Sequence, residues 1–191
     1  MVDELILGAK KGSPAGCFRT TSWLDATLSQ LVDHIEQTHH KYLKKELPRL
    51  QTLADKVALV HGAKDTRLKE VATVFLAFKE EIEQHTRKEE SILFPYLRKI
   101  EKEASSTPPP FGSVANPVRC MESEHADAGD ALLKLRQLTD QYAAPEHACA
   151  SWKALLSGLA ELDKDLRIHI HKENSILFPK AIARESEHAR Y

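Results

Sequence analysis

The amino-acid sequence predicts an all-α fold, an up-down four-helix bundle made of two pseudo-symmetric helical hairpins. Leu, Ala, Glu, Lys and Arg dominate the composition, and these residue types favour helices. No segment alternates apolar and polar residues as a half-buried strand does. The sequence also repeats itself, because HTRKEESILFP at 85–95 returns as HIHKENSILFP at 169–179, 84 residues later. A chain of 191 residues is long enough for one well-packed domain of this kind.

Composition and charge exclude several classes of protein. The net charge of −1 at pH 7, with 29% charged residues, argues against a nucleic-acid-binding surface or a polybasic membrane patch. No apolar run approaches the roughly 20 residues that cross a bilayer, and the N-terminus lacks the pattern of a signal peptide. Cys17, Cys120 and Cys149 are widely spaced, which indicates free thiols in a reducing compartment. We therefore expect a cytoplasmic protein with no nucleic-acid or membrane partner.

The first half of the chain is predicted to hold two helices. Residues 1–21 contain three of the seven glycines and are expected to form an arm or loose lead-in. The first helix is predicted to begin at Thr-Ser (21–22), which are good N-cap residues, and to end at His-Gly (61–62). Pro48 should kink or reset this helix, because proline lacks the backbone N–H. The second helix is predicted at about 65–97.

The second half is predicted to repeat this arrangement. The stretch 104–117, ASSTPPPFGSVANP, is rich in turn residues and is expected to be non-helical. The third helix should follow at about 118–142, and the fourth at about 147–184, after a short break. The helical domain is thus predicted to span 22–184 and to be followed by a C-terminal tail at 185–191.

Two of the predicted helices carry an inward stripe that includes polar residues. The stripes have the alternating four- and three-residue spacing of a helix packed in a bundle. Their members are Val71, Phe75, Phe78, Ile82, His85, Glu89 and Ile92 in the second helix, and Leu155, Leu159, Leu162, Leu166, His169, Glu173 and Ile176 in the fourth. A buried carboxylate without a partner is very costly, so a cation is its natural partner. Pro95 and Pro179 follow these positions and are predicted to kink each helix.

The other two helices each add one histidine. His125 lies on an apolar face of the third helix, and His40 lies 85 residues earlier, in THHKYLKKELP. Each hairpin then supplies one single histidine and one His-x-x-x-Glu pair. The candidate metal ligands are His40, His85, Glu89, His125, His169 and Glu173. Two alternatives remain open: the apolar stripe of the first helix centres on His39, and His61 is either a fifth nitrogen ligand or a helix cap.

The residue types narrow the metal chemistry. Imidazole with carboxylate suits Fe, Zn, Mn or Cu, and six ligands exceed the four of a tetrahedral zinc site. Two metal ions, each with two histidines and sharing both glutamates as bridges, would use all six residues. Such a centre has few carboxylates to stabilise high-valent iron. That favours binding of small diatomic molecules or iron handling over hydroxylation of hydrocarbons.

Five phrases of the sequence resemble the hemerythrin-like (HHE) domain of the RIC family, the repair of iron centres proteins. They occur in order between about residues 23 and 183 and read DHI at 33–35, THHKYLKKELPRL, HTRKEESILFP, MESEHADAG and HIHKENSILFP. The resemblance implies a four-helix bundle around an oxo- and carboxylate-bridged, non-haem di-iron centre. It implies the same six ligands, with Glu89 and Glu173 as the bridges.

The resemblance also implies a function in nitrosative and oxidative stress. The implied roles are repair of iron–sulfur clusters and binding or reduction of nitric oxide. Oxygen or peroxide would be further small ligands, and damaged iron–sulfur proteins would be partners; a homodimer stays open. The alternatives are a non-catalytic carrier or sensor of oxygen or nitric oxide, and an iron-handling regulatory bundle. The sequence departs from the family pattern in one respect. Typical members carry a module with paired cysteines before this domain, whereas here about 20 residues with the single Cys17 precede Trp23. No role of that module is therefore implied.

Overall fold

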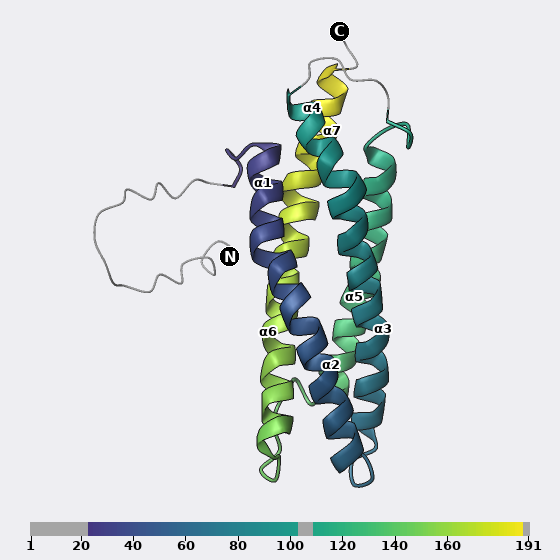
Figure 1. Cartoon of the computed structure of the whole chain (residues 1–191), viewed down its shortest axis with the longest axis vertical. Coiled ribbons are helices and arrows are strands. Elements are labelled where there is room, and N and C mark those ends of the chain that lie inside the picture. Colours follow the sequence, from purple (N-terminus) through teal and green to yellow (C-terminus); the bar gives the residue numbers. More distant parts are fainter. Residues whose placement is uncertain (1–22, 103–108, 189–191) are drawn as a thin grey trace, which may run out of the picture.

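The structure is a computed structural model that describes residues 23–102 and 109–188. Figure 1 shows long helical rods that lie side by side and run alternately down and up the molecule. No β-strand occurs in the described ranges. The predicted all-α, up-down four-helix bundle is therefore confirmed. The predicted N-terminal arm, 1–21, lies outside the described residues.

Three of the four rods contain a short π-helical segment. The first rod consists of α1 (Leu28–Ile35), η2 (Glu36–His40) and α2 (Lys41–His61). The second consists of α3 (Arg67–Lys88), η3 (Glu89–Leu93) and α4 (Phe94–Lys102). The third is α5 (Ala115–Leu138), and the fourth consists of α6 (Ala150–Lys172), η4 (Glu173–Leu177) and α7 (Phe178–His188). In space, α2 packs against α3 and α6, and α3 packs against α5.

The first rod begins and ends at local sequence signals. The Thr27 hydroxyl accepts a hydrogen bond from the backbone N–H of Gln30, and the Gln30 side chain accepts one from the backbone N–H of Thr27, which is a capping box. The helix start predicted at 21–22 is wrong, because residues 23–27 are described and are not helical, and α1 begins only at Leu28. Gly62 is the C-cap of α2, as predicted. The reset predicted at Pro48 is wrong, because α2 continues through this residue.

The ends of the later helices differ by a few residues from the prediction. α5 begins at Ala115, inside the stretch predicted to be non-helical. This is possible because Pro117 lies in the first turn, where its missing N–H needs no partner within the helix. α5 stops before 140–142, since these residues have positive φ angles of 49°, 63° and 65°. α6 begins at Ala150, and α7 continues to His188, so the predicted tail begins within a helix.

The π segments precede the two prolines of the repeated phrase. Pro95 and Pro179 are each the second residue of the α-helix that follows a π segment. In a regular α-helix a proline ring clashes with the carbonyl group four residues earlier. The wider π turn, with hydrogen bonds from i to i+5, changes that register. Where the sequence predicts a kink at each proline, the structure has a π segment that begins six residues before the proline, at Glu89 or Glu173.

The same segments shift the residues that face the core. The inward stripes are buried as predicted up to the two glutamates. Beyond them, Ile92 is 51% exposed and Leu93 is buried in its place. In the fourth rod Leu177 is fully buried, whereas Ile176 is only partly buried. A π turn inserts an extra residue, so the inward face moves on by one position. The prediction is therefore wrong for Ile92 and holds only in part for Ile176.

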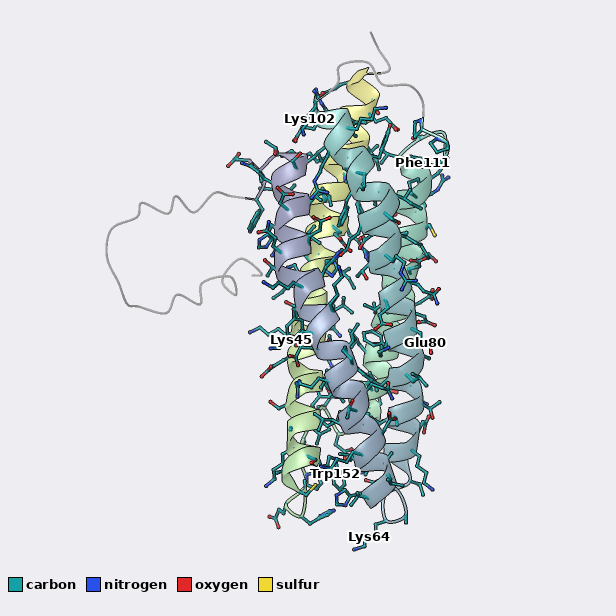
Figure 2. The ribbon with its side chains drawn as sticks, viewed as in Figure 1. Lys45, Lys64, Glu80, Lys102, Phe111 and Trp152 are labelled. Atoms are coloured by element: carbon teal, nitrogen blue, oxygen red, sulfur yellow. The ribbon has the colours of Figure 1, made fainter. Side chains whose placement is uncertain are left out.

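Two apolar clusters fill the bundle and leave a polar layer between them. The larger lies among α2, α3, α5 and α6 and includes Phe75 and Trp152. The smaller lies among α1, α4, α7 and the start of α5 and includes Phe94, with Phe111 packed against it. Trp152 and Phe111 mark opposite ends of the bundle, and charged side chains such as Lys45 project outward (Figure 2). Among the helices described, none has the length and apolar character needed to span a membrane.

A buried carboxylate ties α5 to α6 and to the loop between them. Asp163 is 2% exposed, and its Oδ2 accepts hydrogen bonds from the Arg136 guanidinium at 2.6 and 2.9 Å and from the Tyr142 hydroxyl at 3.0 Å. Burial raises the pKa of Asp163, but Arg167 and Arg136 outweigh burial and hold the pKa below its usual value. The carboxylate is therefore ionised and holds three surrounding side chains in place.

Asp163→Ala is expected to lower the free energy of unfolding by about 2–4 kcal/mol, because it leaves Arg136 and Tyr142 without their buried acceptor. Urea denaturation followed by circular dichroism measures this change. As a control, Lys134→Ala removes an exposed ion pair with Glu70 and should cost at most about 1 kcal/mol. Equal losses in the two variants would contradict the role of Asp163.

Candidate metal centre

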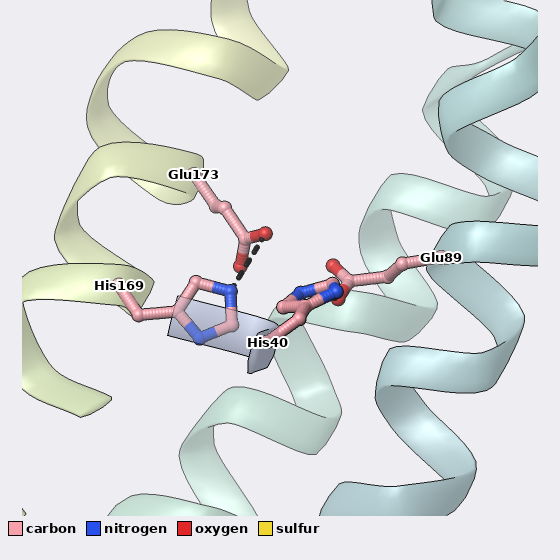
Figure 3. A group of neighbouring side chains, drawn as sticks. All are labelled: His40, Glu89, His169 and Glu173. Carbon is pink, nitrogen blue, oxygen red and sulfur yellow. Dashed lines mark ion pairs between the residues drawn. The ribbon is translucent and has the colours of Figure 1, made fainter. Parts of the chain in front are cut away.

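The six candidate ligands meet in the polar layer at the middle of the bundle. They form two sets whose ligand atoms all lie within 4.8 Å of one another: His40, Glu89, His169 and Glu173 in one, and His85, Glu89, His125 and Glu173 in the other. Both glutamates belong to both sets, which is the arrangement expected for two ions that share two carboxylates. Figure 3 shows the first set, in which side chains of three different rods point at one another.

Each glutamate faces one histidine of each set through the Nε2 atom of the ring. The four separations between Nε2 and the nearer carboxylate oxygen are 3.3 Å (His40 to Glu89), 3.4 Å (His85 to Glu89), 3.1 Å (His125 to Glu173) and 3.0 Å (His169 to Glu173). In the second set, His85 Nε2 also lies 3.1 Å from His125 Nε2. Four imidazole nitrogens therefore converge on the two carboxylates.

The three π segments coincide with ligand positions. His40 is the last residue of η2, while Glu89 and Glu173 are the first residues of η3 and η4. His85 and His169 come from the last turns of α3 and α6, immediately before those segments. Single π turns inside α-helices are rare and are frequent at functional sites. Because the π segments begin or end at ligand residues, we infer that the irregular backbone serves to place these ligands.

The cluster fits a cation, because it buries charge and leaves polar atoms without partners. All six residues are at most 5% exposed, and both glutamates are fully buried. Both carboxylate oxygens of Glu89 and Glu173, and the Nε2 atoms of His40 and His169, make no hydrogen bond to any described residue. Such atoms are costly in a protein interior, and metal ions would satisfy them. Four imidazoles with two carboxylates suit iron, zinc, manganese or copper.

The electrostatics favour an ionised Glu173 and positively charged rings of His85 and His40. Burial lowers the pKa of His85, but Glu89 and the neighbouring carboxylates outweigh burial and raise the pKa to about 9. The pKa of His40 is raised in the same way. Burial raises the pKa of Glu173, but the surrounding histidines outweigh burial and hold that pKa well below its usual range. The polar layer therefore attracts cations. Without metal, the raised pKa values of His85 and His40 favour protonated rings.

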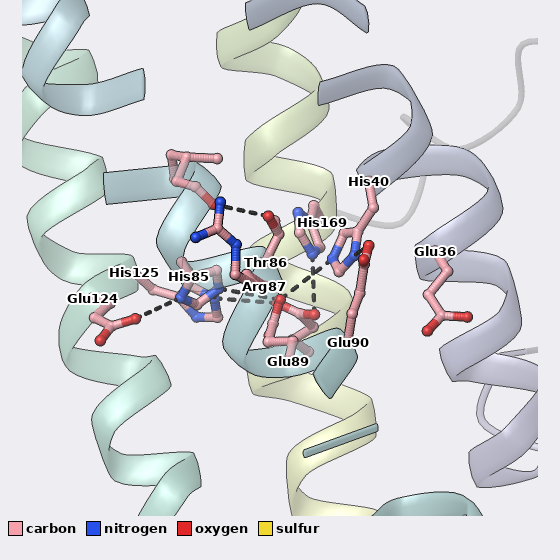
Figure 4. A network of polar contacts seen from close by, with 12 residues as sticks. Glu36, His40, His85, Thr86, Arg87, Glu89, Glu90, Glu124, His125 and His169 are labelled. Atoms are coloured by element: carbon pink, nitrogen blue, oxygen red, sulfur yellow. Dashed lines mark hydrogen bonds and ion pairs between the residues drawn. The ribbon is translucent and has the colours of Figure 1, made fainter. Parts of the chain in front are cut away.

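A second layer of hydrogen bonds orients three of the four histidines. Their Nδ1 atoms contact Glu90 Oε1 (His40, 2.8 Å), Glu124 Oε2 (His85, 2.9 Å) and Asn174 Oδ1 (His125, 2.8 Å). Figure 4 shows the two carboxylates beside the histidines that they contact. Lys44 donates to the first carboxylate and Lys88 to the second. Partners of this kind fix the tautomer and the ring orientation of metal-ligating histidines.

None of these three partners is predicted as a site residue from the sequence. The repeat contains a signal for two of them, because Glu90 and Asn174 occupy the same position of the repeated phrase. Each contacts the single histidine of its own hairpin, His40 or His125. The signal is weak because one residue is charged and the other is neutral.

The structure separates the alternatives that the sequence leaves open. His40 belongs to a ligand set, whereas His39 is buried beside it but faces Asp165 on α6. His61 belongs to neither set and lies at the end of α2, where its Nε2 is 3.2 Å from Cys149 Sγ. Within the described ranges, no cysteine joins either set.

Comparison with known proteins places these features in a family. A family model described as the Hemerythrin HHE cation binding domain matches residues 37–181, which include all six candidate ligands. A probable iron-sulfur cluster repair protein of Haemophilus influenzae is 38% identical over 160 residues, 84% of this chain and 68% of that protein. The iron-sulfur cluster repair proteins YtfE of Citrobacter koseri and Escherichia coli O81 are 37% and 38% identical over 164 residues, 85% of this chain and 70% of each relative. The chain therefore belongs to the hemerythrin HHE cation-binding family, as its five phrases predict.

Proposed function

We propose that this chain holds two iron ions bridged by Glu89 and Glu173 and that it repairs iron–sulfur clusters under nitrosative and oxidative stress. The metal centre is supported by one observation above all. Six buried ligand residues converge, and the carboxylate oxygens among them have no other partner. The repair function is supported by the relatives, which are named iron-sulfur cluster repair proteins.

Two bound irons would supply a redox-active pair that binds small diatomic molecules such as nitric oxide or oxygen. The protein's own residues hold and orient this pair. The four imidazoles and two carboxylates fix the positions of the ions, and the Nδ1 contacts fix the rings. Phe94 and Phe178 stack on His40 and His125, with ring centroids 5.5 and 6.0 Å apart, and separate the centre from water on the side of the smaller cluster.

A surface pocket lies beside one candidate ligand of the centre, His85. The pocket has a volume of about 190 Å³ and is lined by His85, Glu124, Lys88 and Glu81, among others. This volume exceeds the roughly 30 Å³ that a water molecule occupies in the liquid, so a diatomic molecule or a hydrated ion can enter. The acidic side chains in its lining suit a cation. We propose that ligands and iron exchange from the His85 side.

The test of this function combines metal analysis with a repair assay. Protein prepared without oxygen should hold two irons per chain, show two iron sites by Mössbauer spectroscopy, and react with nitric oxide in the reduced form. It should also restore the activity of an iron–sulfur enzyme that nitric oxide has damaged. A Glu89→Ala, Glu173→Ala double variant is the control. It should neither hold two irons nor restore the damaged enzyme. Reversible binding of oxygen or nitric oxide without restored enzyme activity would instead identify a carrier or sensor.

A further inference from the structure

His39 is buried next to the candidate centre without belonging to it. The residue is 2% exposed, and it belongs to neither ligand set. Its ring lies against the ring of His169, with the planes parallel within 1° and the centroids 5.2 Å apart. A histidine from η2 thus covers one face of a candidate ligand on α6.

Two residues of α6 hold the His39 ring in this position. Asp165 Oδ1 accepts from His39 Nδ1 at 2.9 Å, and the Lys172 ammonium donates to His39 Nε2 at 3.0 Å. Asp165 lies four residues before His169 and Lys172 three residues after it, so both lie on the His169 side of the helix. The ring of His39 is therefore fixed at both nitrogens by the helix that carries His169.

His169 lacks the support that the other three histidines have. Its Nδ1 is buried and has no hydrogen-bond partner among the described residues. Metal-ligating histidines almost always donate their second ring N–H to a carboxylate, a carbonyl or water, and this partner fixes the ring. At His169 no such partner is found, and the parallel ring of His39 packs against a face of the imidazole instead.

The internal repeat supports the same conclusion. His39 precedes His40 just as Glu124 precedes His125, so the two occupy equivalent positions of the two hairpins. Glu124 reaches across to the ligand His85 and to Lys88, three residues beyond it. His39 reaches across to the corresponding His169 and Lys172. The two hairpins therefore contact equivalent ligands from the same position of the repeat. Glu124 does so through a hydrogen bond to His85, and His39 through its ring, which packs against His169.

We propose that His39, held by Asp165 and Lys172, is a positioning residue that fixes the His169 ring for the metal ion bound with His40. This inference rests on the proposed di-iron centre. Stacking on a clamped ring restricts rotation of the His169 imidazole, so its Nε2 stays aimed at Glu173, 3.0 Å away. The effect should fall on one of the two ions, because His169 belongs to one ligand set only.

Ferrous iron titrated without oxygen into the metal-free protein, followed by calorimetry and Mössbauer spectroscopy, tests this role. His39→Leu should weaken the binding of one ion by about 10- to 100-fold, while the other ion is retained. Asp165→Asn, which keeps the shape of the side chain, should weaken the same ion to a smaller extent. His171→Leu is the matched control, because it removes an exposed histidine from the same helix and should leave both ions unchanged.

The outcomes separate this role from the centre itself. If the unaltered chain holds two irons and His39→Leu binds both as tightly, His39 does not position His169. If both ions weaken equally in His39→Leu and the metal-free variant also melts at a lower temperature, His39 only supports the fold, and the proposal fails. An unaltered chain that holds fewer than two irons would overturn the di-iron centre, and the positioning role with it.

Discussion

Glu89→Ala is expected to retain less than half of the iron that the unaltered chain holds. Glu89 is fully buried, belongs to both ligand sets, and lies 3.3 Å from His40 Nε2 and 3.4 Å from His85 Nε2. The substitution removes one of two anions that offset the charge of both cations, in an interior where unpaired charge is costly. The adjacent Glu90 cannot take its place, because its carboxylate is held by His40 Nδ1 and Lys44.

Iron content after anaerobic loading and gel filtration measures this effect, and the Mössbauer spectrum shows which site is lost. His85→Ala is the informative comparison, because it removes a ligand from one set only and should leave one ion bound. Glu83→Ala removes a carboxylate of α3 that is 41% exposed and paired with Lys79, and it should leave the iron content unchanged. A Glu89→Ala protein with two irons and an unaltered spectrum would show that Glu89 is not a bridge.

The ligand-bearing faces of the helices could be predicted because periodicity and repetition constrain them together. Phe75, Met121 and Leu166 are buried where a period of 3.6 residues places them, and the polar candidates follow on the same faces. A single histidine on an apolar stripe can be either a metal ligand or an ordinary buried histidine. Two His-x-x-x-Glu pairs on equivalent apolar stripes favour metal ligands over ordinary core histidines, because the two hairpins bury these stripes against each other.

The π segments and the contacts between rods could not be predicted in this way. A stripe continued at 3.6 residues per turn places Ile92 inward, whereas the π turn brings Leu93 there instead. The following proline signals an irregularity without specifying its kind. The wider turn at the end of η2 also lets both His39 and His40 be buried. The contact of Glu124 with His85 joins residues 39 positions apart on different helices, and no local pattern encodes it.

Metal-free protein is expected to lose stability as the pH rises from about 6.5 to about 9, whereas iron-loaded protein is not. Without metal, the pKa of His85 lies at about 9 in the folded state, above its usual value of 6.5. A group whose pKa is raised by folding contributes its full stabilisation below the unfolded pKa and loses it as the pH rises through the folded pKa. For His85 this contribution is on the order of 3 kcal/mol. The pKa of His40 is also raised, so its deprotonation acts in the same direction.

Bound iron removes this dependence, because the imidazoles coordinate as neutral ligands and the metal ions offset the charges of Glu89 and Glu173. Thermal unfolding of metal-free and iron-loaded protein at pH 6.5, 8 and 9 measures the effect. The difference in melting temperature should widen by at least about 5 °C over this range. His85→Gln should flatten the pH dependence of the metal-free protein, since it removes the titrating ring but keeps a polar side chain. A metal-free protein that melts at the same temperature at pH 6.5 and 9 would contradict the pairing of protonated histidines with the two buried carboxylates. The two carboxylates would then have no electrostatic requirement for a cation beside them.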